Sequence, residues 1–194
     1  MPSVRAASAQ KQQHGAILAP ASTGPNADLY VGKCIHYAIS MRVGIADTTF
    51  SRFDYAAVVL KVLGSSKPKV EVERYTVPGI KDLPVASLVL FRKGCDIVIA
   101  CGMVGGAPID TQCAHEASTG LQAVQLKEGK HILEVFVHVN EAKDEADLAS
   151  ICEDRARKHA ENALMLLYDH GAMQRRAGTG RRQGRPDEGP LGTG

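Results

Sequence analysis

Lys81 lies between two apolar runs, in the segment Val77 to Asp82, and is a candidate for ligand binding or catalysis. A glycine there lets the backbone approach a ligand, and amides near a helix start donate to a carbonyl or an anionic ring. The ammonium group of Lys81 could stabilise negative charge that develops on such a ring. A tight turn with a solvated lysine is the plainer alternative. The candidate binding residues around this lysine are Val77, Pro78, Gly79, Ile80 and Asp82.

Two histidine and carboxylate pairs are candidates for proton transfer. His115 precedes Glu116, and His138 lies three residues before Glu141. An imidazole titrates near neutral pH and acts as a general acid or base, although a lone histidine in such a place is more often structural. His131 lies at the opposite end of a predicted strand from His138, so the sequence predicts no metal site that joins them.

Two further segments could contact a ligand. Thr48 and Thr49 can hydrogen-bond the edge of a heterocycle while Phe50 stacks on its plane; alternatively, Thr49 caps a helix and Phe50 belongs to the core. The segment GMVGGAP, which begins with Gly102 and Met103, is rich in glycine. It matches neither of the glycine-rich phosphate-binding motifs, so we expect no nucleotide phosphate site there.

Strands that alternate with helices must position these segments. We expect a parallel sheet with helices on both faces, because each strand is followed by a helical pattern. Ligands bind beyond the carboxyl ends of the strands in such a sheet, which gathers the four segments at one edge. The expected strands cover 42–46, 70–77, 96–101 and 131–139. The first expected helix follows a capping box at 51–54 and ends at Gly64. Three further helices are expected over 82–94, 110–125 and 141–168.

The composition limits the other functions that the chain could have. The formal net charge is +2, and residues 41–194 hold 20 basic and 20 acidic side chains, so we expect no nucleic acid partner. No apolar run is long enough to span a membrane. The five cysteines form no CxxC pair, which indicates a reducing, cytoplasmic setting. We expect a disordered extension over 1–40, one α/β domain over 41–170, and a flexible tail rich in arginine and glycine over 171–194.

Several segments of the chain resemble archaeal-type riboflavin synthase, a family related to lumazine synthase. The matches occur in order and with matching spacing from about residue 41 to 190. They are VGIADTTFSRFD (43–54), TVPGIKDLPVA (76–86), GCDIVIACGM (94–103), CAHEASTGL (113–121), HILEVFVHVNEAKD (131–144), RARKHAENA (155–163) and AGTGRRQG (177–184).

The resemblance implies a three-layer, lumazine synthase-like fold whose four-stranded parallel sheet has the order 2-1-3-4. It also implies a homopentamer with active sites between subunits, in which two molecules of 6,7-dimethyl-8-ribityllumazine dismutate to riboflavin and 5-amino-6-ribitylaminouracil. Lys81 and the adjacent amides would stabilise the anion, while His115, Glu116 or His138 would move protons. No organic cofactor is implied, and Mg²⁺ or Mn²⁺ would only stimulate the reaction.

Two alternatives stay open beside this expectation. Lumazine synthase has a longer loop after the third strand, with an arginine and a histidine that GMVGGAPIDTQ lacks. The other is a catalytically silent module that binds a lumazine or flavin. Val104 and the pair Gly106 and Ala107 also depart from the riboflavin synthase pattern. Glu134, which is unusual within an apolar strand, is expected at a subunit interface if that strand is a sheet edge.

Overall fold

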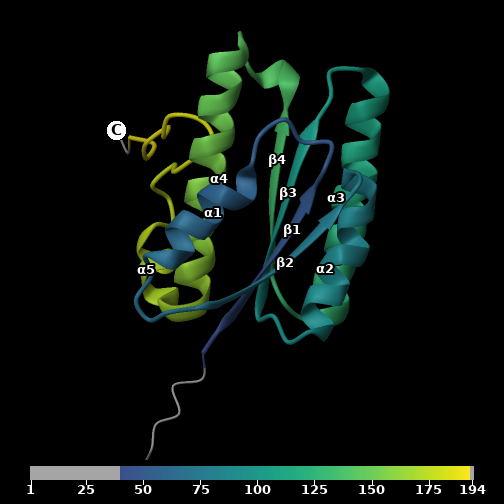
Figure 1. Ribbon diagram of the computed structural model, residues 1–194. Coiled ribbons are helices and arrows are strands. Elements are labelled where there is room, and N and C mark those ends of the chain that lie inside the picture. The colour runs from purple at the N-terminus through teal and green to yellow at the C-terminus, as the bar shows by residue number, and fades with distance from the viewer. Residues whose placement is uncertain (1–39, 193–194) are drawn as a thin grey trace, which may run out of the picture. The chain divides into compact units, whose positions relative to one another are not determined.

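The computed structural model describes residues 40–192, so the expected N-terminal extension lies almost wholly outside the described residues. Four strand and helix units follow one another, as the sequence pattern predicts (Figure 1). The strands are β1 (Arg42–Thr48), β2 (Glu71–Val77), β3 (Ile97–Val104) and β4 (Ile132–His138). The helices are α1 (Tyr55–Gly64), α2 (Leu83–Arg92), α3 (Pro108–Glu128), α4 (Glu145–Tyr168) and α5 (His170–Arg175), with 3₁₀ turns η1 (Ile80–Asp82) and η2 (Val139–Glu141).

The four strands form one parallel sheet in the order β2-β1-β3-β4, which confirms the expected order. Thr48 at the end of β1 pairs with Val77 at the end of β2, and Val104 of β3 pairs with His138 of β4. The four carboxyl ends therefore reach the same edge of the sheet. α1 and α4 cover one face of the sheet and α2 and α3 cover the other, which gives the expected three layers (Figure 1).

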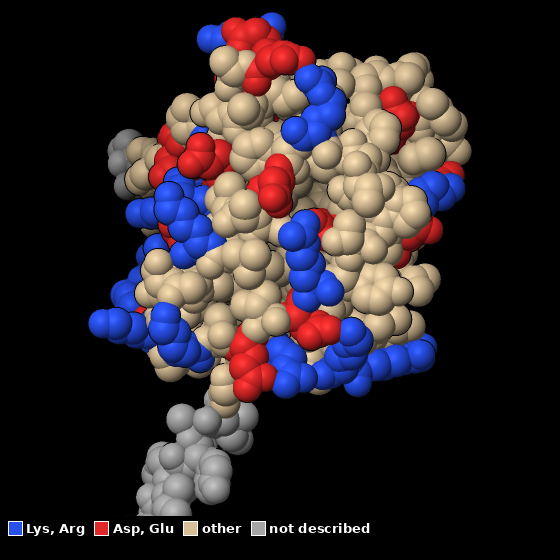
Figure 2. Space-filling view, in the orientation of Figure 1, with Lys and Arg blue, Asp and Glu red and all other residues tan. Residues whose placement is uncertain are grey.

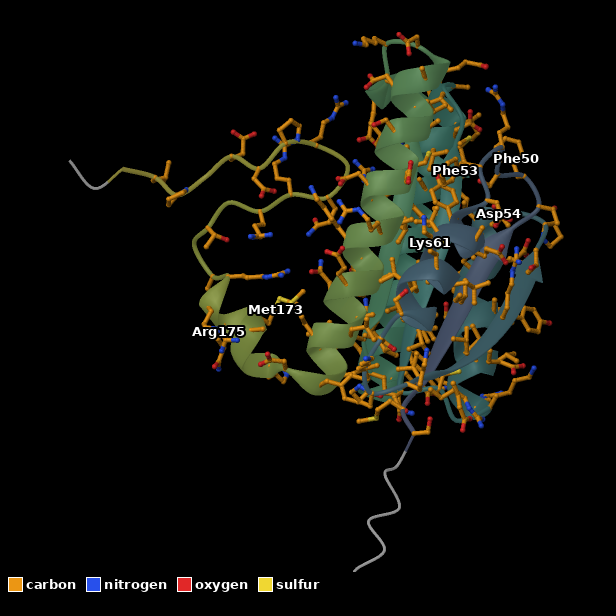
Figure 3. The ribbon with its side chains drawn as sticks, turned by 60° about the vertical axis from the view of Figure 1, so that its left-hand side comes forward. Phe50, Phe53, Asp54, Lys61, Met173 and Arg175 are labelled. Atoms are coloured by element: carbon orange, nitrogen blue, oxygen red, sulfur yellow. The ribbon has the colours of Figure 1, made fainter. Side chains whose placement is uncertain are left out.

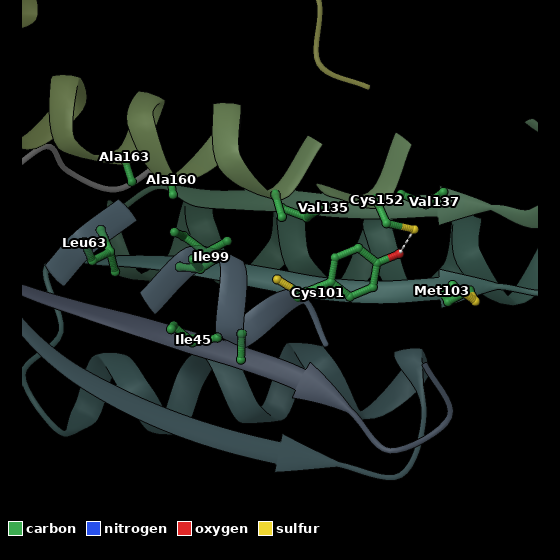
Figure 4. Close-up of a cluster of buried hydrophobic side chains, with 14 of the residues drawn as sticks. Ile45, Leu63, Ile99, Cys101, Met103, Val135, Val137, Cys152, Ala160 and Ala163 are labelled. Atoms are coloured by element: carbon green, nitrogen blue, oxygen red, sulfur yellow. Dashed lines mark hydrogen bonds between the residues drawn. The ribbon is translucent and has the colours of Figure 1, made fainter. Parts of the chain in front are cut away.

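A separate apolar core fills the space on each face of the sheet. Under α1 and α4, the buried ring of Tyr55 lies among aliphatic side chains such as Ile99, and its hydroxyl lies 3.1 Å from the Sγ atom of Cys152 (Figure 4). Under α2 and α3, the core includes Leu83 and Phe136. β3 is buried at every position because it lies inside the sheet and is covered on both faces.

The predicted starts of two helices are wrong by a few residues. α1 is capped by Asp54, whose carboxylate accepts a hydrogen bond from the N–H of Ala57 at 3.0 Å, whereas the Ser51 hydroxyl bonds to the backbone of Phe53. α3 begins at Pro108 rather than at Asp110, because proline suits a first helical turn. The Asp110 carboxylate accepts from the N–H of Ala107 at 2.9 Å.

Two other predicted boundaries also differ. β3 continues to Val104, so Gly102 and Met103 are buried strand residues and not part of a loop. α4 begins at Glu145 instead of Glu141, because η2 lies between β4 and the helix. After α5, residues 176–192 contain neither helix nor strand and are hydrogen-bonded to α4 and η2. No helix within residues 40–192 is both long enough and apolar enough to cross a membrane.

Candidate active site

A hollow of about 410 Å³ opens at the carboxyl edge of the sheet, where the sequence predicts a ligand site. Its volume lies within the range of roughly 300 to 1,000 Å³ that small-molecule sites usually have. The end of β3, the turn η1 and the first turns of α3 surround it. The lining residues are Phe50, Pro78, Gly79, Ile80, Lys81, Asp82, Met103, Val104, Gly105, Asp110 and Cys113.

The hollow brings together seven of the residues that the sequence singles out: Phe50, Pro78, Gly79, Ile80, Lys81, Asp82 and Met103. Eight others do not line it: Thr48, Thr49, Val77, Gly102, His115, Glu116, His138 and Glu141. Four lining residues are not among the candidates: Val104 and Gly105, which belong to the segment GMVGGAP, and Asp110 and Cys113. Asp110 and Cys113 reach the hollow from the first turns of α3, which begins at Pro108 and not at Asp110 as expected.

Backbone hydrogen bonds to the end of β2 hold Phe50 at the entrance of the hollow. The N–H of Thr49 donates to the carbonyl of Val77 at 2.9 Å, and the N–H of Phe50 donates to the carbonyl of Pro78 at 3.3 Å. The Phe50 side chain is 61% exposed and does not belong to the core (Figure 3). The Thr49 hydroxyl donates to the Pro78 carbonyl, so it caps no helix. An exposed ring fixed in this way is available to stack on a planar ligand.

Thr48 and Asp47 lie just inside the same edge and hold the ends of β1 and β2. The Thr48 hydroxyl is buried and has no hydrogen-bond partner among the described residues. The Asp47 carboxylate accepts from Arg74 at 2.5 Å and from the Thr76 hydroxyl at 2.7 Å. This cross-strand network fixes the position from which the loop with Phe50 departs. No sequence motif indicates it, because its members become neighbours only in the sheet.

Lys81 lies on the rim and forms an ion pair with Glu116 of α3. The hydrogen bond with Glu116 raises the pKa of Lys81, and the same bond, aided by Gln112, lowers the pKa of Glu116. Both groups are therefore charged at neutral pH. The lysine is suited to stabilise an anion, whereas the carboxylate has little tendency to accept a proton.

Glu141 makes its contacts within its own chain. Its carboxylate accepts hydrogen bonds from Arg155 at 2.6 and 2.8 Å and from the N–H of His138 at 2.9 Å. Burial favours the neutral acid, but these hydrogen bonds outweigh it and hold the pKa of Glu141 below its usual range. His138 is half-buried beside Val104 of β3, and His115 is exposed on α3.

Glu134 lies on the edge strand β4, as expected, and is half-buried. Its carboxylate accepts a hydrogen bond from the Ser118 hydroxyl of α3 at 2.9 Å, while burial raises its pKa. The bond to α3 gives this charge a role within the chain. Its place at a subunit interface stays a prediction.

The turn η1 lies directly against β3, and Gly102 makes this contact possible. A Cβ atom at Gly102 would lie 2.6 Å from Cγ2 of Ile80 and 3.2 Å from the Phe136 ring. Any side chain there would push η1, and Lys81 with it, away from the sheet. Gly102 therefore acts by its absence of a side chain and does not itself line the hollow.

The charged residues of the hollow decide which ligands suit it. Lys81 is opposed by Asp82 and Asp110, so the lining has a small net negative charge. Charged side chains gather along the lower edge in Figure 2, at the amino ends of the strands, whereas the upper right of that view is largely uncharged. Among residues 40–192, no group of three or more His, Cys, Asp or Glu side chains is arranged to hold a metal ion. The charge of the lining favours an uncharged ligand over a phosphorylated one.

Comparison with known proteins identifies several relatives of this chain. The riboflavin synthase of Methanothermobacter thermautotrophicus is 47% identical over 152 residues, which cover 78% of this chain and 99% of the relative. That of Archaeoglobus fulgidus shows the same identity and coverage, and that of Aeropyrum pernix is 44% identical over 162 residues, 83% of this chain and 99% of the relative. A 6,7-dimethyl-8-ribityllumazine synthase of Leifsonia xyli is 37% identical over 93 residues, 45% of this chain and 59% of the relative.

The matched family model covers the whole sheet and its main helices. It describes 6,7-dimethyl-8-ribityllumazine synthase and matches residues 40–169, which include every residue that lines the hollow. From the fold, the hollow at the strand ends and these matches, the chain belongs to the 6,7-dimethyl-8-ribityllumazine synthase family.

Proposed function

We propose that the chain is a riboflavin synthase, a transferase that dismutates two molecules of 6,7-dimethyl-8-ribityllumazine. One molecule gives a four-carbon unit to the other, which yields riboflavin and 5-amino-6-ribitylaminouracil. The observation that carries the proposal is the exposed ring of Phe50 beside a hollow of small net charge that Lys81 also lines. The relatives named riboflavin synthase, which match over almost their whole length, support it.

The hollow provides what binding of a lumazine needs. One ring system stacks on Phe50, and the amides at the start of η1 donate to its carbonyl groups, since the first amides of a helix lack helical partners. Holding two rings face to face replaces a random encounter by a fixed geometry, which lowers the barrier by several kcal/mol. The Asp47 network and the β1 and β2 backbone bonds supply that rigidity.

The chemistry begins with loss of a proton from the 7-methyl group of one lumazine, which spreads negative charge over the heterocycle. Lys81 carries the positive charge that stabilises this anion. Glu116 and Glu141 are each held in an ion pair, so they are poor proton acceptors. His115 and His138 are the two remaining candidates for proton transfer, and single replacements of each by alanine decide between them.

A second copy of the chain is proposed to complete the site, in a homopentamer with sites between subunits. Phe50, which lines the hollow, is 61% exposed, and Ile109, which precedes the lining residue Asp110, is 60% exposed. A neighbouring subunit would cover them and confine the second lumazine. Sedimentation analysis tests the assembly, and mixing two inactive variants with defects on opposite sides of the interface tests whether sites are shared.

The reaction needs no redox cofactor, because no electrons are gained or lost overall, and we propose that Mg²⁺ or Mn²⁺ only stimulates it. We also propose that the enzyme acts in the cytoplasm, which suits the free thiols of Cys95, Cys101, Cys113 and Cys152. Activity measured with and without a chelator tests the proposed stimulation by Mg²⁺ or Mn²⁺.

One assay separates this function from its rivals. The purified protein is incubated with the lumazine alone, and riboflavin is followed by its absorbance and fluorescence. Riboflavin formation supports the proposal, whereas tight binding without turnover would leave a binding module. Turnover only from a pyrimidine and a butanone phosphate would make it a lumazine synthase. The loop of three residues, Gly105 to Ala107, and the lining charge disfavour that phosphorylated substrate.

A further inference from the structure

A hollow of about 510 Å³ lies between α4 and the C-terminal segment 176–187 (Figure 3). Five basic side chains line it, but three of them already have carboxylate partners. Arg157 pairs with Asp154 and Glu161, Lys158 pairs with Asp154, and Arg182 pairs with Glu188. These pairs lie within α4 or within the segment itself, so other bonds attach the segment to α4.

The C-terminal segment is attached most closely at Gly184 and Arg185. The N–H of Gly184 donates to the Asp154 carboxylate at 2.8 Å, and the Lys158 ammonium donates to the Arg185 carbonyl at 3.4 Å. Gly184 is buried with φ of +78°, and a Cβ atom there would lie 2.7 Å from the Nε atom of Arg155. Only glycine fits both the backbone conformation and the space. The segment thus has a specific seat on α4.

Arg185 reaches from this seat to the turn between β4 and α4. Its guanidinium donates to the backbone carbonyl of Glu141, while the Glu141 side chain is held by two hydrogen bonds from Arg155. The Arg155 side chain is only 14% exposed, so these charge-assisted bonds are largely shielded from solvent. The turn is therefore held from both sides, by α4 and by the C-terminal segment.

The same turn holds the loop that lines the active site. Asn140, next to Glu141, donates from its side-chain amide to the Gly106 carbonyl at 3.1 Å. Gly105 lines the hollow of the active site, and Ala107 is bonded through its N–H to Asp110, which also lines it. Two hydrogen bonds, joined by the backbone between Asn140 and Glu141, thus connect Arg185 through η2 to the loop between β3 and α3.

We propose that Arg185 is a positioning residue, which fixes the active-site loop 105–107 through Glu141 and Asn140. The effect on catalysis rests on the proposed riboflavin synthase function, whereas the effect on the loop does not. Arg185 touches no part of the hollow, so it acts only through the turn. An ångström of misplacement in an active site can cost a large factor in rate.

The test measures backbone amide exchange of residues 102–110 and the steady-state kinetics in the full-length protein. For Arg185→Ala, we expect exchange in this stretch to rise about threefold to tenfold, and kcat/KM to fall about tenfold, because a hydrogen bond to a charged group is lost. Arg185→Lys keeps a donor and should restore most of both. Arg181→Ala is the matched control, since Arg181 is exposed in the same segment.

Asn140→Ala breaks the last link and should loosen residues 102–110 while residues 180–188 keep their protection. Unchanged exchange at 102–110 in both the Arg185→Ala and Asn140→Ala proteins would overturn the proposal, whatever the activity. Equal loosening of the whole chain would overturn it too, because Arg185 would then support general stability. If exchange rises as expected but the protein makes no riboflavin, the positioning role stands and the proposed function fails.

Discussion

Phe50 is the residue on which the proposed ligand class depends most directly. Its ring is exposed and makes no contribution to either core, so it is free to stack on a ligand. We expect Phe50→Ala to raise KM for the lumazine about tenfold or more, since stacking of a base on an aromatic side chain contributes about 1 to 3 kcal/mol. Phe50→Tyr should keep most of the affinity. Substrate titration of initial rates measures both.

Leu126→Ala is the control for this replacement, because Leu126 is 86% exposed on α3 and does not line the hollow. It should change neither KM nor the midpoint of thermal unfolding. An unchanged KM for Phe50→Ala would remove the stacking role and with it the main support for a planar substrate.

Lys81 and Glu116 form an exposed ion pair, so their replacement separates catalysis from stability. Exposed pairs contribute little to folding, and we expect Lys81→Ala to unfold at nearly the same temperature as the original protein. Its kcat should fall at least tenfold, because the ammonium that stabilises the developing anion is gone. Glu116→Gln should reduce kcat much less, since the carboxylate holds the lysine and accepts no proton. Equal losses for both variants would instead indicate that Glu116 takes part in proton transfer.

At the scale of elements, the apolar pattern predicts the four strands and four main helices, because burial on both faces leaves a continuous apolar run such as Ile97–Cys101. The ends of the elements are harder to predict. The glycine-rich composition predicts that Gly102 lies in a loop, yet in the structure it belongs to β3. Glycine is needed there since Ile80 fills the space that a side chain would take. The strand order 2-1-3-4 came from the family resemblance, since periodicity alone does not distinguish it from other orders.

The candidate site was predictable only where its residues are close in the sequence. The segment 77–82 was found because proline, glycine and lysine interrupt two apolar runs. Asp110 and Cys113 were missed because they reach the hollow from a helix that starts two residues earlier than expected. The role of Arg155 as the partner of Glu141 was also missed, because the two residues meet only when α4 packs on β4. Contacts between elements leave little trace in a single sequence.

Two glycines of the sheet provide a test of how closely η1 must lie on β3. Gly102→Ala should destabilise the fold by about 1 to 3 kcal/mol through overpacking, and should also raise KM, because it displaces Ile80 and Lys81. Gly44→Ala is the matched control: its Cβ atom would lie 3.0 Å from Val98 and 3.1 Å from Leu90, away from the hollow. It should lower stability with little change in KM. Urea unfolding and substrate titration distinguish the two, and equal effects on KM would contradict the argument.

At the scale of the whole described chain, residues that are distant in sequence meet around η2. The C-terminal segment, α4, β4 and the loop after β3 are joined there by hydrogen bonds of Arg185, Arg155 and Asn140. The sequence alone predicts a flexible tail in this region. In the structure Arg182 pairs with Glu188 and Arg185 donates to the Glu141 carbonyl, so this segment has specific contacts. The stability of this junction then depends on the charges of its carboxylates.

Acid should weaken that junction, because two of its carboxyl groups have lowered pKa values. Burial opposes ionisation of both Glu141 and Asp154, but Arg155 outweighs it at Glu141, and Lys158 with the N–H of Gly184 outweighs it at Asp154. A carboxyl group whose pKa is lower in the folded state stabilises the fold above its unfolded pKa of about 4. That stabilisation is lost as the pH falls through the folded value. We therefore expect the free energy of unfolding to decline steeply below about pH 4.

Glu141→Gln isolates one of these groups while it keeps the shape of the side chain. At pH 7 the variant should be less stable by about 1 kcal/mol or more, since Arg155 loses its charged partner. As the pH falls, the original protein loses the same contribution, so the two curves of unfolding free energy against pH should converge. Urea unfolding from pH 7 to 3 measures both curves, and amide exchange of residues 180–188 shows whether the tail loosens over the same range. Parallel curves would mean that the Glu141 carboxylate contributes no pH-dependent stability, and that the tail is held by other contacts.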